Sequence, residues 1–224
     1  MGIRDYNGNT VPVGGGASPI AGKRIAMIGD SNLQYNSDTI KAHMEETYGC
    51  TFIPLGFAGA SWETADGADA ADNNGVGRVN TIVANVDSDK LITEYDGIVI
   101  MLGTNCNTLG TLEDTSERVD TMCGAMRYCL EKLCYYGRRI PIGVIVPIRN
   151  AYSTAEMPEK FACIEQIAQE YAVPTLNLYN AGRILPDKDI PDGQPYYLSD
   201  EVHLGGSGVL QIAHRIGKWI AYQL

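Results

Sequence analysis

The chain has 224 residues, 45% of them hydrophobic, and a net charge of −10. This length suits one domain with a full hydrophobic core. The acidic balance argues against nucleic acid as a partner, because phosphate binding needs clustered Lys and Arg, and against docking on an anionic membrane. No segment approaches the roughly 18 apolar residues of a membrane span, and no signal-peptide core opens the chain, so we expect cytoplasmic synthesis.

Residues 1–22 are rich in glycine and proline, with the run Gly14-Gly15-Gly16 at their centre. Such a composition is typical of a flexible lead-in or linker, and we therefore expect the folded domain to span 23–224. Two origins of the lead-in stay open. It is either a tether to a larger assembly or a remnant of expression.

From Lys23 onwards, short apolar runs alternate with stretches of helical periodicity. Strands are predicted at 24–28, 51–55, 98–102, 140–146 and 175–178. Helices are predicted at 38–48, 78–86, 116–136, 158–171 and 206–222, and a loop rich in Gly, Ala and Asp at 56–77. Strands separated by helices form parallel sheets that are covered on both faces. The pattern therefore predicts a three-layer α/β/α sandwich around a five-stranded parallel sheet, with no second domain.

The cysteines and histidines show no metal-site spacing. The six cysteines include no Cys-x-x-Cys pair, and the three histidines are scattered. Cys123, Cys129 and Cys134 share one predicted helix and are interpreted as small buried hydrophobes, which favours a reducing compartment. We expect no metal and no cofactor. A nucleotide- or flavin-binding domain would need a glycine-rich loop after the first strand, where this chain has one glycine and an aspartate.

Two polar turns follow apolar strands, and a third motif lies near the end of the chain. Gly29-Asp30-Ser31 follows 25–28, Gly103-Thr104-Asn105 follows 98–102, and Asp200-Glu201-Val202-His203 precedes the last helix. Each is also an ordinary turn or cap sequence. Ligand sites in open α/β sheets gather at the carboxyl ends of strands. A serine, a histidine beside a carboxylate and amide donors together favour acyl transfer.

His203 is the expected general base, because it lies in a loop with a carboxylate three positions earlier. The other two histidines, His43 and His214, fall inside predicted helices and are interpreted as surface or packing residues. Asp30 is interpreted as a turn and helix-cap residue.

From about Lys23 to its end, the chain resembles the SGNH hydrolases, also called GDSL-type lipases or acylhydrolases, on the three motifs above and on Gly56-Phe57-Ala58-Gly59-Ala60. The resemblance implies a flavodoxin-like fold. It also implies a site in which Ser31 is the nucleophile, His203 the base, Asp200 its orienter, and Ser31 N–H, Gly59 N–H and the Asn105 side chain the oxyanion donors. Glu201 competes with Asp200 for the orienting role.

The chain departs from the family pattern at three positions. Asn32 stands where leucine is usual after the serine, Cys106 where aspartate is usual after the third motif, and Leu204 where proline often follows the histidine. None of these changes removes a group that handles protons. Cys106 is expected to alter how its loop is held.

Trp62, Tyr196 and Tyr197 flank the second and last motifs. They are interpreted either as an aromatic wall suited to a sugar ring or as packing residues. No long apolar lid for fatty chains is evident. We therefore expect a serine esterase that acts on short acyl esters, such as O-acetyl groups on a carbohydrate. The alternatives are a catalytically silent glycan-binding module of the same fold and a lysophospholipase- or thioesterase-type acylhydrolase.

Overall fold

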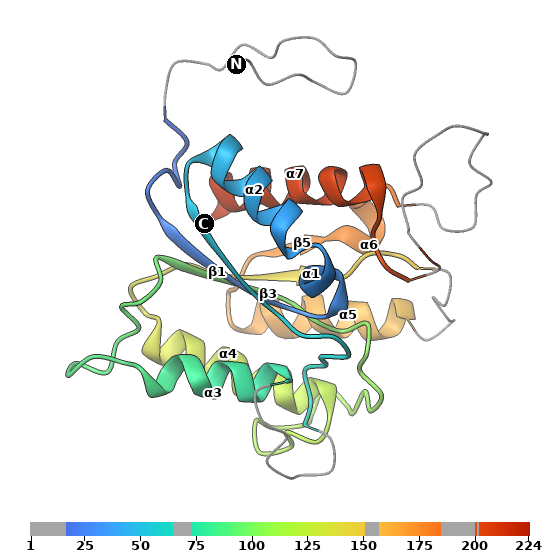
Figure 1. The fold of residues 1–224 in the computed structure, drawn as a ribbon. Coiled ribbons are helices and arrows are strands. Elements are labelled where there is room, and N and C mark those ends of the chain that lie inside the picture. Colours follow the sequence, from blue (N-terminus) through green and yellow to red (C-terminus); the bar gives the residue numbers. More distant parts are fainter. Residues whose placement is uncertain (1–16, 65–72, 151–156, 185–199, 201) are drawn as a thin grey trace.

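The computed structural model describes residues 17–64, 73–150, 157–184, 200 and 202–224 (Figure 1). Its strands are β1 (Arg24–Gly29), β2 (Thr51–Gly56), β3 (Gly97–Met101), β4 (Ile142–Val146) and β5 (Thr175–Asn177). Its helices are α1 (Ser31–Tyr35), α2 (Ser37–Tyr48), α3 (Gly75–Ala84), α4 (Met122–Tyr136), α5 (Met157–Glu170), α6 (Leu178–Ala181) and α7 (Gly206–Gln223).

The strands form one parallel sheet in the order β2-β1-β3-β4-β5. This confirms the predicted five-stranded α/β/α fold. The strand order reverses between β1 and β3, because the chain proceeds outwards from β1 to β2 and then crosses to β3. The carboxyl ends of β1 and β3 therefore flank the switch point, where open α/β sheets place their ligand sites.

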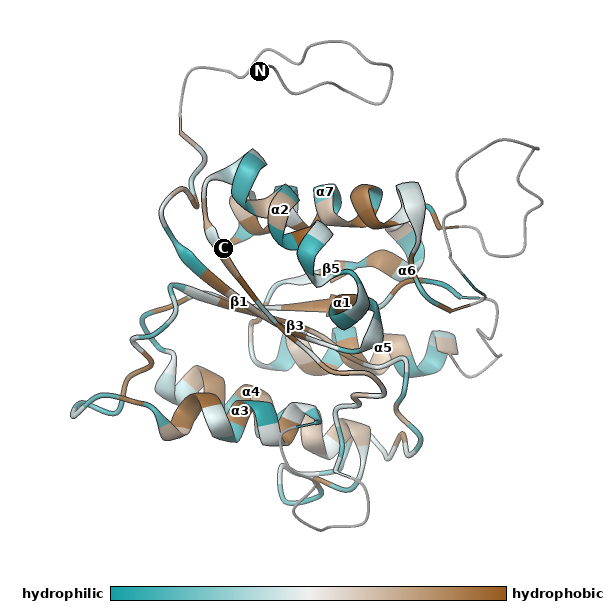
Figure 2. Cartoon of the chain, viewed as in Figure 1, coloured by the Kyte–Doolittle hydropathy of each residue, from teal (hydrophilic) through white to brown (hydrophobic). Residues whose placement is uncertain are grey.

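The three inner strands β1, β3 and β4 are buried on both faces of the sheet, which is why they read as near-continuous apolar runs. Ile25 and Met27 of β1 face the layer that contains α2 and α7, whereas Ala26 and Ile28 face the layer of α3, α4 and α5. In Figure 2 the strands are predominantly hydrophobic and the outer surfaces of the helices carry the hydrophilic residues. Two cores on one sheet give the site a rigid support.

Two helices begin elsewhere than predicted, and side-chain caps explain both. α4 begins at Met122 rather than at residue 116, because Thr121 Oγ1 accepts a hydrogen bond from Gly124 N at 3.2 Å. α3 begins at Gly75 rather than at residue 78, because Asn74 Oδ1 accepts from Gly77 N at 2.8 Å. Capping side chains set these helix starts, whereas apolar periodicity locates only the helix body.

The folded domain begins before the predicted boundary at residue 22. Ile20 is 4% exposed and packs in the same core as α2 and α7. Gly22 N also donates to Gly49 O at 2.8 Å, so this stretch is fixed to the domain. The rest of the predicted lead-in, residues 1–16, lies outside the described residues.

All six cysteines are free thiols. Cys123 and Cys129 are buried as predicted, and burial raises the pKa of the Cys123 thiol to about 12. Cys134 is half-buried. Across the described ranges, no helix combines the length and apolar character that crossing a membrane requires.

Candidate active site

The nucleophile candidate lies where β1 turns into a helix. Ser31 is the first residue of α1, and the Asp30 carboxylate caps that helix by accepting a hydrogen bond from Asn32 N at 2.9 Å. Asp30 is 1% exposed, and its burial raises the pKa of its carboxyl group. The interpretation of Asp30 as a cap residue is confirmed. Ser31 stands at the carboxyl end of β1, beside the switch point.

The loop before α7 brings a histidine and a carboxylate to this serine. His203 Nε2 lies 2.9 Å from Ser31 Oγ, and His203 Nδ1 lies 2.8 Å from Asp200 Oδ2. The second Asp200 oxygen accepts from Val202 N at 2.7 Å and from His203 N at 2.6 Å. The His203 side chain and these amides lower the pKa of Asp200 to about 2. The three side chains form a continuous hydrogen-bonded relay, and Glu201 lies outside the described residues.

Asn32 fastens the histidine loop to the serine helix. Its Oδ1 accepts a buried hydrogen bond from Leu204 N at 2.8 Å. Asn36, at the other end of α1, donates from Nδ2 to Asn32 O at 3.0 Å and to Leu204 O at 3.3 Å. Sequence reasoning noted Asn32 as a departure from the family pattern without assigning it a role. An amide at a position where leucine is usual was the available signal.

The second loop is tied to the serine turn and to α1 by hydrogen bonds from two of its backbone amides. Phe57 N donates to Gly29 O at 3.0 Å, and Ala58 N donates to Gln34 Oε1 on α1 at 2.6 Å. Gly59 has a φ of +77°, a conformation that glycine adopts without cost. No described residue accepts a hydrogen bond from the Gly59 N–H. Among the described residues, the Gly59 N–H therefore has no acceptor and is available to donate to an oxyanion.

Asn105 joins the third loop to the second. Its Nδ2 donates to Ala60 O at 3.0 Å, which fixes the plane of the side-chain amide. A carboxamide nitrogen carries two hydrogens, so one of them stays available for a further acceptor. The structure thus links both predicted oxyanion loops to each other, and the hydrogen bonds of the second loop link them to α1.

A buried carboxylate holds the third loop from behind. Glu63 is 6% exposed, and its Oε1 accepts from Asn107 N at 2.7 Å. Lys160 Nζ donates to Cys106 O at 2.5 Å. Burial, followed by the nearby Glu63 charge, raises the pKa of the Cys106 thiol well above its usual range. Cys106 is thus a protonated packing residue, and sequence reasoning missed Glu63 because a lone glutamate in a loop carries no periodic signal.

Trp62 does not line a pocket: its assignment to an aromatic wall is wrong, and the alternative interpretation as a packing residue agrees with the structure. The side chain is 0% exposed and packs in the core with α3 and α4. Its Nε1 donates to Leu102 O at 3.0 Å, and its backbone N–H donates to Cys106 Sγ at 3.3 Å. Trp62 therefore supports the third loop from inside. The other two predicted aromatic residues, Tyr196 and Tyr197, lie outside the described residues.

The remaining histidines lie away from the serine. His43 on α2 and His214 on α7 meet with ring centroids 5.8 Å apart, and burial lowers the pKa of each. His43 is half-buried and His214 is exposed, which agrees with their interpretation as surface or packing residues. Within the described ranges, no three His, Cys, Asp or Glu side chains cluster as metal ligands.

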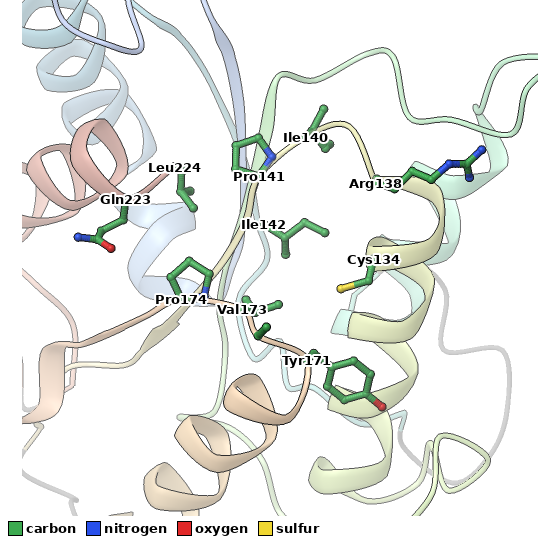
Figure 3. Close-up of a pocket in the computed structure, with 12 residues that line it drawn as sticks. Cys134, Arg138, Ile140, Pro141, Ile142, Tyr171, Val173, Pro174, Gln223 and Leu224 are labelled. Carbon is green, nitrogen blue, oxygen red and sulfur yellow. The ribbon is translucent and has the colours of Figure 1, made fainter.

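A cavity of about 290 Å³ lies at the amino ends of β4 and β5 (Figure 3). Its lining includes Pro141 and Ile142 at the start of β4, Pro174 just before β5, and Leu224 after α7. Because all strands are parallel, the start of β4 lies at the amino-terminal side of the sheet and the end of β1 at its carboxyl-terminal side. The cavity is therefore separate from the serine site.

Comparisons by sequence found no match, neither to a family model nor to a curated protein. Solved structures do share the fold. A GDSL-like lipase from Bacteroides ovatus matches with 18% identity and a TM-score of 0.59, over 89% of this chain and 98% of that one. An SGNH hydrolase from Slackia heliotrinireducens matches with 14% identity and a TM-score of 0.56, over 89% and 99%. An acetyl xylan esterase matches with 16% identity and a TM-score of 0.60, over 89% and 99%.

Proposed function

We propose that this chain is a serine esterase that hydrolyses short-chain acyl esters, with O-acetylated carbohydrates as the preferred class. It has the α/β/α fold of the SGNH hydrolases, and its structural neighbours support hydrolase activity. The observation that carries the proposal is the relay from Ser31 Oγ through His203 to Asp200, with hydrogen bonds of 2.9 and 2.8 Å.

The relay supplies what a serine lacks near neutral pH, because a free hydroxyl is a weak nucleophile without a base. Neutral His203 accepts the Ser31 proton at Nε2 as Oγ bonds to the acyl carbon. The Asp200 carboxylate, whose pKa is lowered to about 2, stays ionised and holds the Nδ1–H towards itself. It thereby fixes the tautomer and stabilises the imidazolium that forms.

The carbonyl oxygen becomes negatively charged during attack. In the proposed mechanism it accepts hydrogen bonds from the N–H groups of Gly59 and Ser31 and from Asn105 Nδ2. Donors already fixed by the fold cost no reorganisation at the moment of reaction. Collapse of the intermediate breaks the ester C–O bond, and imidazolium returns its proton to the leaving alcohol. Water then attacks the acyl-enzyme by the same route, which releases the acid and restores Ser31.

The short-acyl, carbohydrate preference rests on two weaker supports. One solved neighbour is an acetyl xylan esterase. The sequence also shows no long apolar lid. A glycan-binding module without turnover is disfavoured, because mere binding does not need a serine hydroxyl, an imidazole and a carboxylate joined by hydrogen bonds.

The test is turnover of p-nitrophenyl esters of graded chain length and of acetylated xylosides by the protein and by Ser31→Ala. We expect acetyl esters to be preferred and Ser31→Ala to cut turnover at least ~10³-fold with the fold intact. Near-normal turnover by a folded Ser31→Ala protein would reject the mechanism.

A further inference from the structure

Tyr35 is an exposed aromatic side chain beside the proposed base. It is 62% exposed, although large hydrophobic side chains ordinarily gain from burial. Its ring centroid lies 5.0 Å from that of His203, with the two planes inclined at 61°. In the described part of the chain, the other exposed large hydrophobic residues are Tyr135, Leu210 and Tyr222. Among the aromatic contacts of the described residues, neither Tyr135 nor Tyr222 packs on a residue of the relay.

The position of Tyr35 follows from the helix that carries the serine. Tyr35 comes four residues after Ser31 in α1, and residues four apart on a helix are neighbours on one face. Asn32 and Asn36 on either side of it bond to Leu204, the residue after His203. The backbone under Tyr35 is therefore fixed relative to the histidine loop, so its ring holds a defined position at the site.

The chemistry of ester cleavage assigns a side of the substrate to this ring. His203 Nε2 returns its proton to the oxygen of the leaving alcohol, so that oxygen must lie beside the imidazole. The rest of the alcohol then extends away from the scissile bond beside the imidazole, against which the Tyr35 ring packs. The acyl oxygen instead faces the donors of the loops around Gly59 and Asn105.

We propose that Tyr35 forms the subsite for the leaving alcohol and selects alcohols that carry a ring with an apolar face, with sugars as the class. This inference rests on the proposed esterase function. An aromatic ring offers a flat apolar surface, and the tyrosine hydroxyl adds a polar handle at its end. Tyr35 replaces the aromatic wall that the sequence placed partly at Trp62, which is buried.

The test compares two acetyl esters that share the acyl group and differ in the alcohol, an acetylated methyl xyloside and ethyl acetate. We expect Tyr35→Ala to lower kcat/KM about 2- to 10-fold for the xyloside ester, mainly through KM, and to change the ethyl ester less than about 2-fold. Tyr35→Phe keeps the ring and should retain the preference. Tyr222→Ala removes a somewhat more exposed ring from α7 and serves as the matched control.

Two outcomes would overturn the inference. An equal loss on both esters would mean that Tyr35 acts only by orienting His203. No loss on either ester would mean that the alcohol does not reach the ring.

The binding of methyl xyloside to the Ser31→Ala protein, followed by NMR titration, adds a readout that needs no turnover. That binding should weaken when Tyr35→Ala is added, and unchanged binding would count against the subsite. Failure of the esterase function itself appears separately, as turnover that survives Ser31→Ala.

Discussion

Replacing Asn32 with leucine tests whether one buried hydrogen bond holds the histidine loop in place. Leucine has nearly the shape of asparagine but cannot accept the hydrogen bond from Leu204 N, which is 2.8 Å from Asn32 Oδ1 and buried. A buried donor left without an acceptor costs about 1–3 kcal/mol. For a domain of this size, 1 kcal/mol shifts Tm by about 2–4 °C, so Asn32→Leu should lower Tm by about 2–12 °C.

Activity should fall further than stability suggests. Leu204 follows His203 directly, so without the hydrogen bond that fixes Leu204 N the imidazole can move away from Ser31 Oγ. A misplacement of about 1 Å can cost about 10²-fold in rate, and we expect kcat/KM to drop by about 10- to 100-fold.

Thermal unfolding followed by circular dichroism, together with kinetics on p-nitrophenyl acetate well below Tm, measures both effects. Asn85→Ala is the control, because Asn85 is exposed and its side chain bonds only to Thr81 O within α3 among the described residues. This control should stay within about 0.5 kcal/mol of the parent. An Asn32→Leu protein that matches the control in both Tm and kcat/KM would refute the reasoning.

Further predictions concern the oxyanion donors, the relay and the cap. Asn105→Ala should lower kcat about 10²- to 10³-fold with a smaller change in KM, and a change confined to KM would reassign Asn105 to ground-state binding. The kcat/KM of the parent should rise with pH through the loss of one proton, because only a neutral imidazole accepts the proton of Ser31, while Asp200 is ionised throughout. A flat profile on a substrate with slow chemistry, or full activity in Asp200→Asn, would separate this pair from the reaction. Asp30→Asn keeps the cap of α1 and removes a buried carboxylate whose raised pKa makes its ionisation costly in the folded state. Since that cost is present above the pKa of the unfolded chain, the variant should be at least as stable as the parent at pH 7, and a clear loss in urea unfolding would contradict this. Chelation followed by desalting should leave ester turnover unchanged, and activity restored only by added metal would reject a metal-free mechanism.

The sequence allowed the sheet to be predicted because its strands are buried on both faces. An apolar run such as 98–102 signals a central parallel strand whatever surrounds it. The beginnings of α3 and α4 were less predictable, since single capping contacts at Asn74 and Thr121 decide them. Caps depend on the conformation of the preceding loop, which periodicity does not encode.

A site residue was predictable where one motif contains a reactive side chain and also lies at a strand end or in a loop that indicates its place in the fold. Ser31 and His203 each follow that rule, and the structure brings them within hydrogen-bonding distance. Trp62 shows the limit, because an aromatic residue beside a motif suits a pocket wall and a core equally well. The supports from Asn32, Glu63 and Tyr35 were missed for a related reason. Each acts through a partner far away in the chain, and sequence spacing alone cannot reveal such pairs.

Ser31 and His203 stand 172 positions apart, and this separation governs when the protein becomes reactive. On a ribosome, the serine emerges early and the histidine only after β5 has been made. Until α7 docks against α2, the hydroxyl has no base and is no more reactive than any surface serine. Under the proposed esterase function, a nascent chain, or one that has released its last helix, therefore leaves esters in its surroundings untouched. Ester hydrolysis would then report on closure of the whole domain, and in refolding experiments its return should lag behind formation of the parallel sheet.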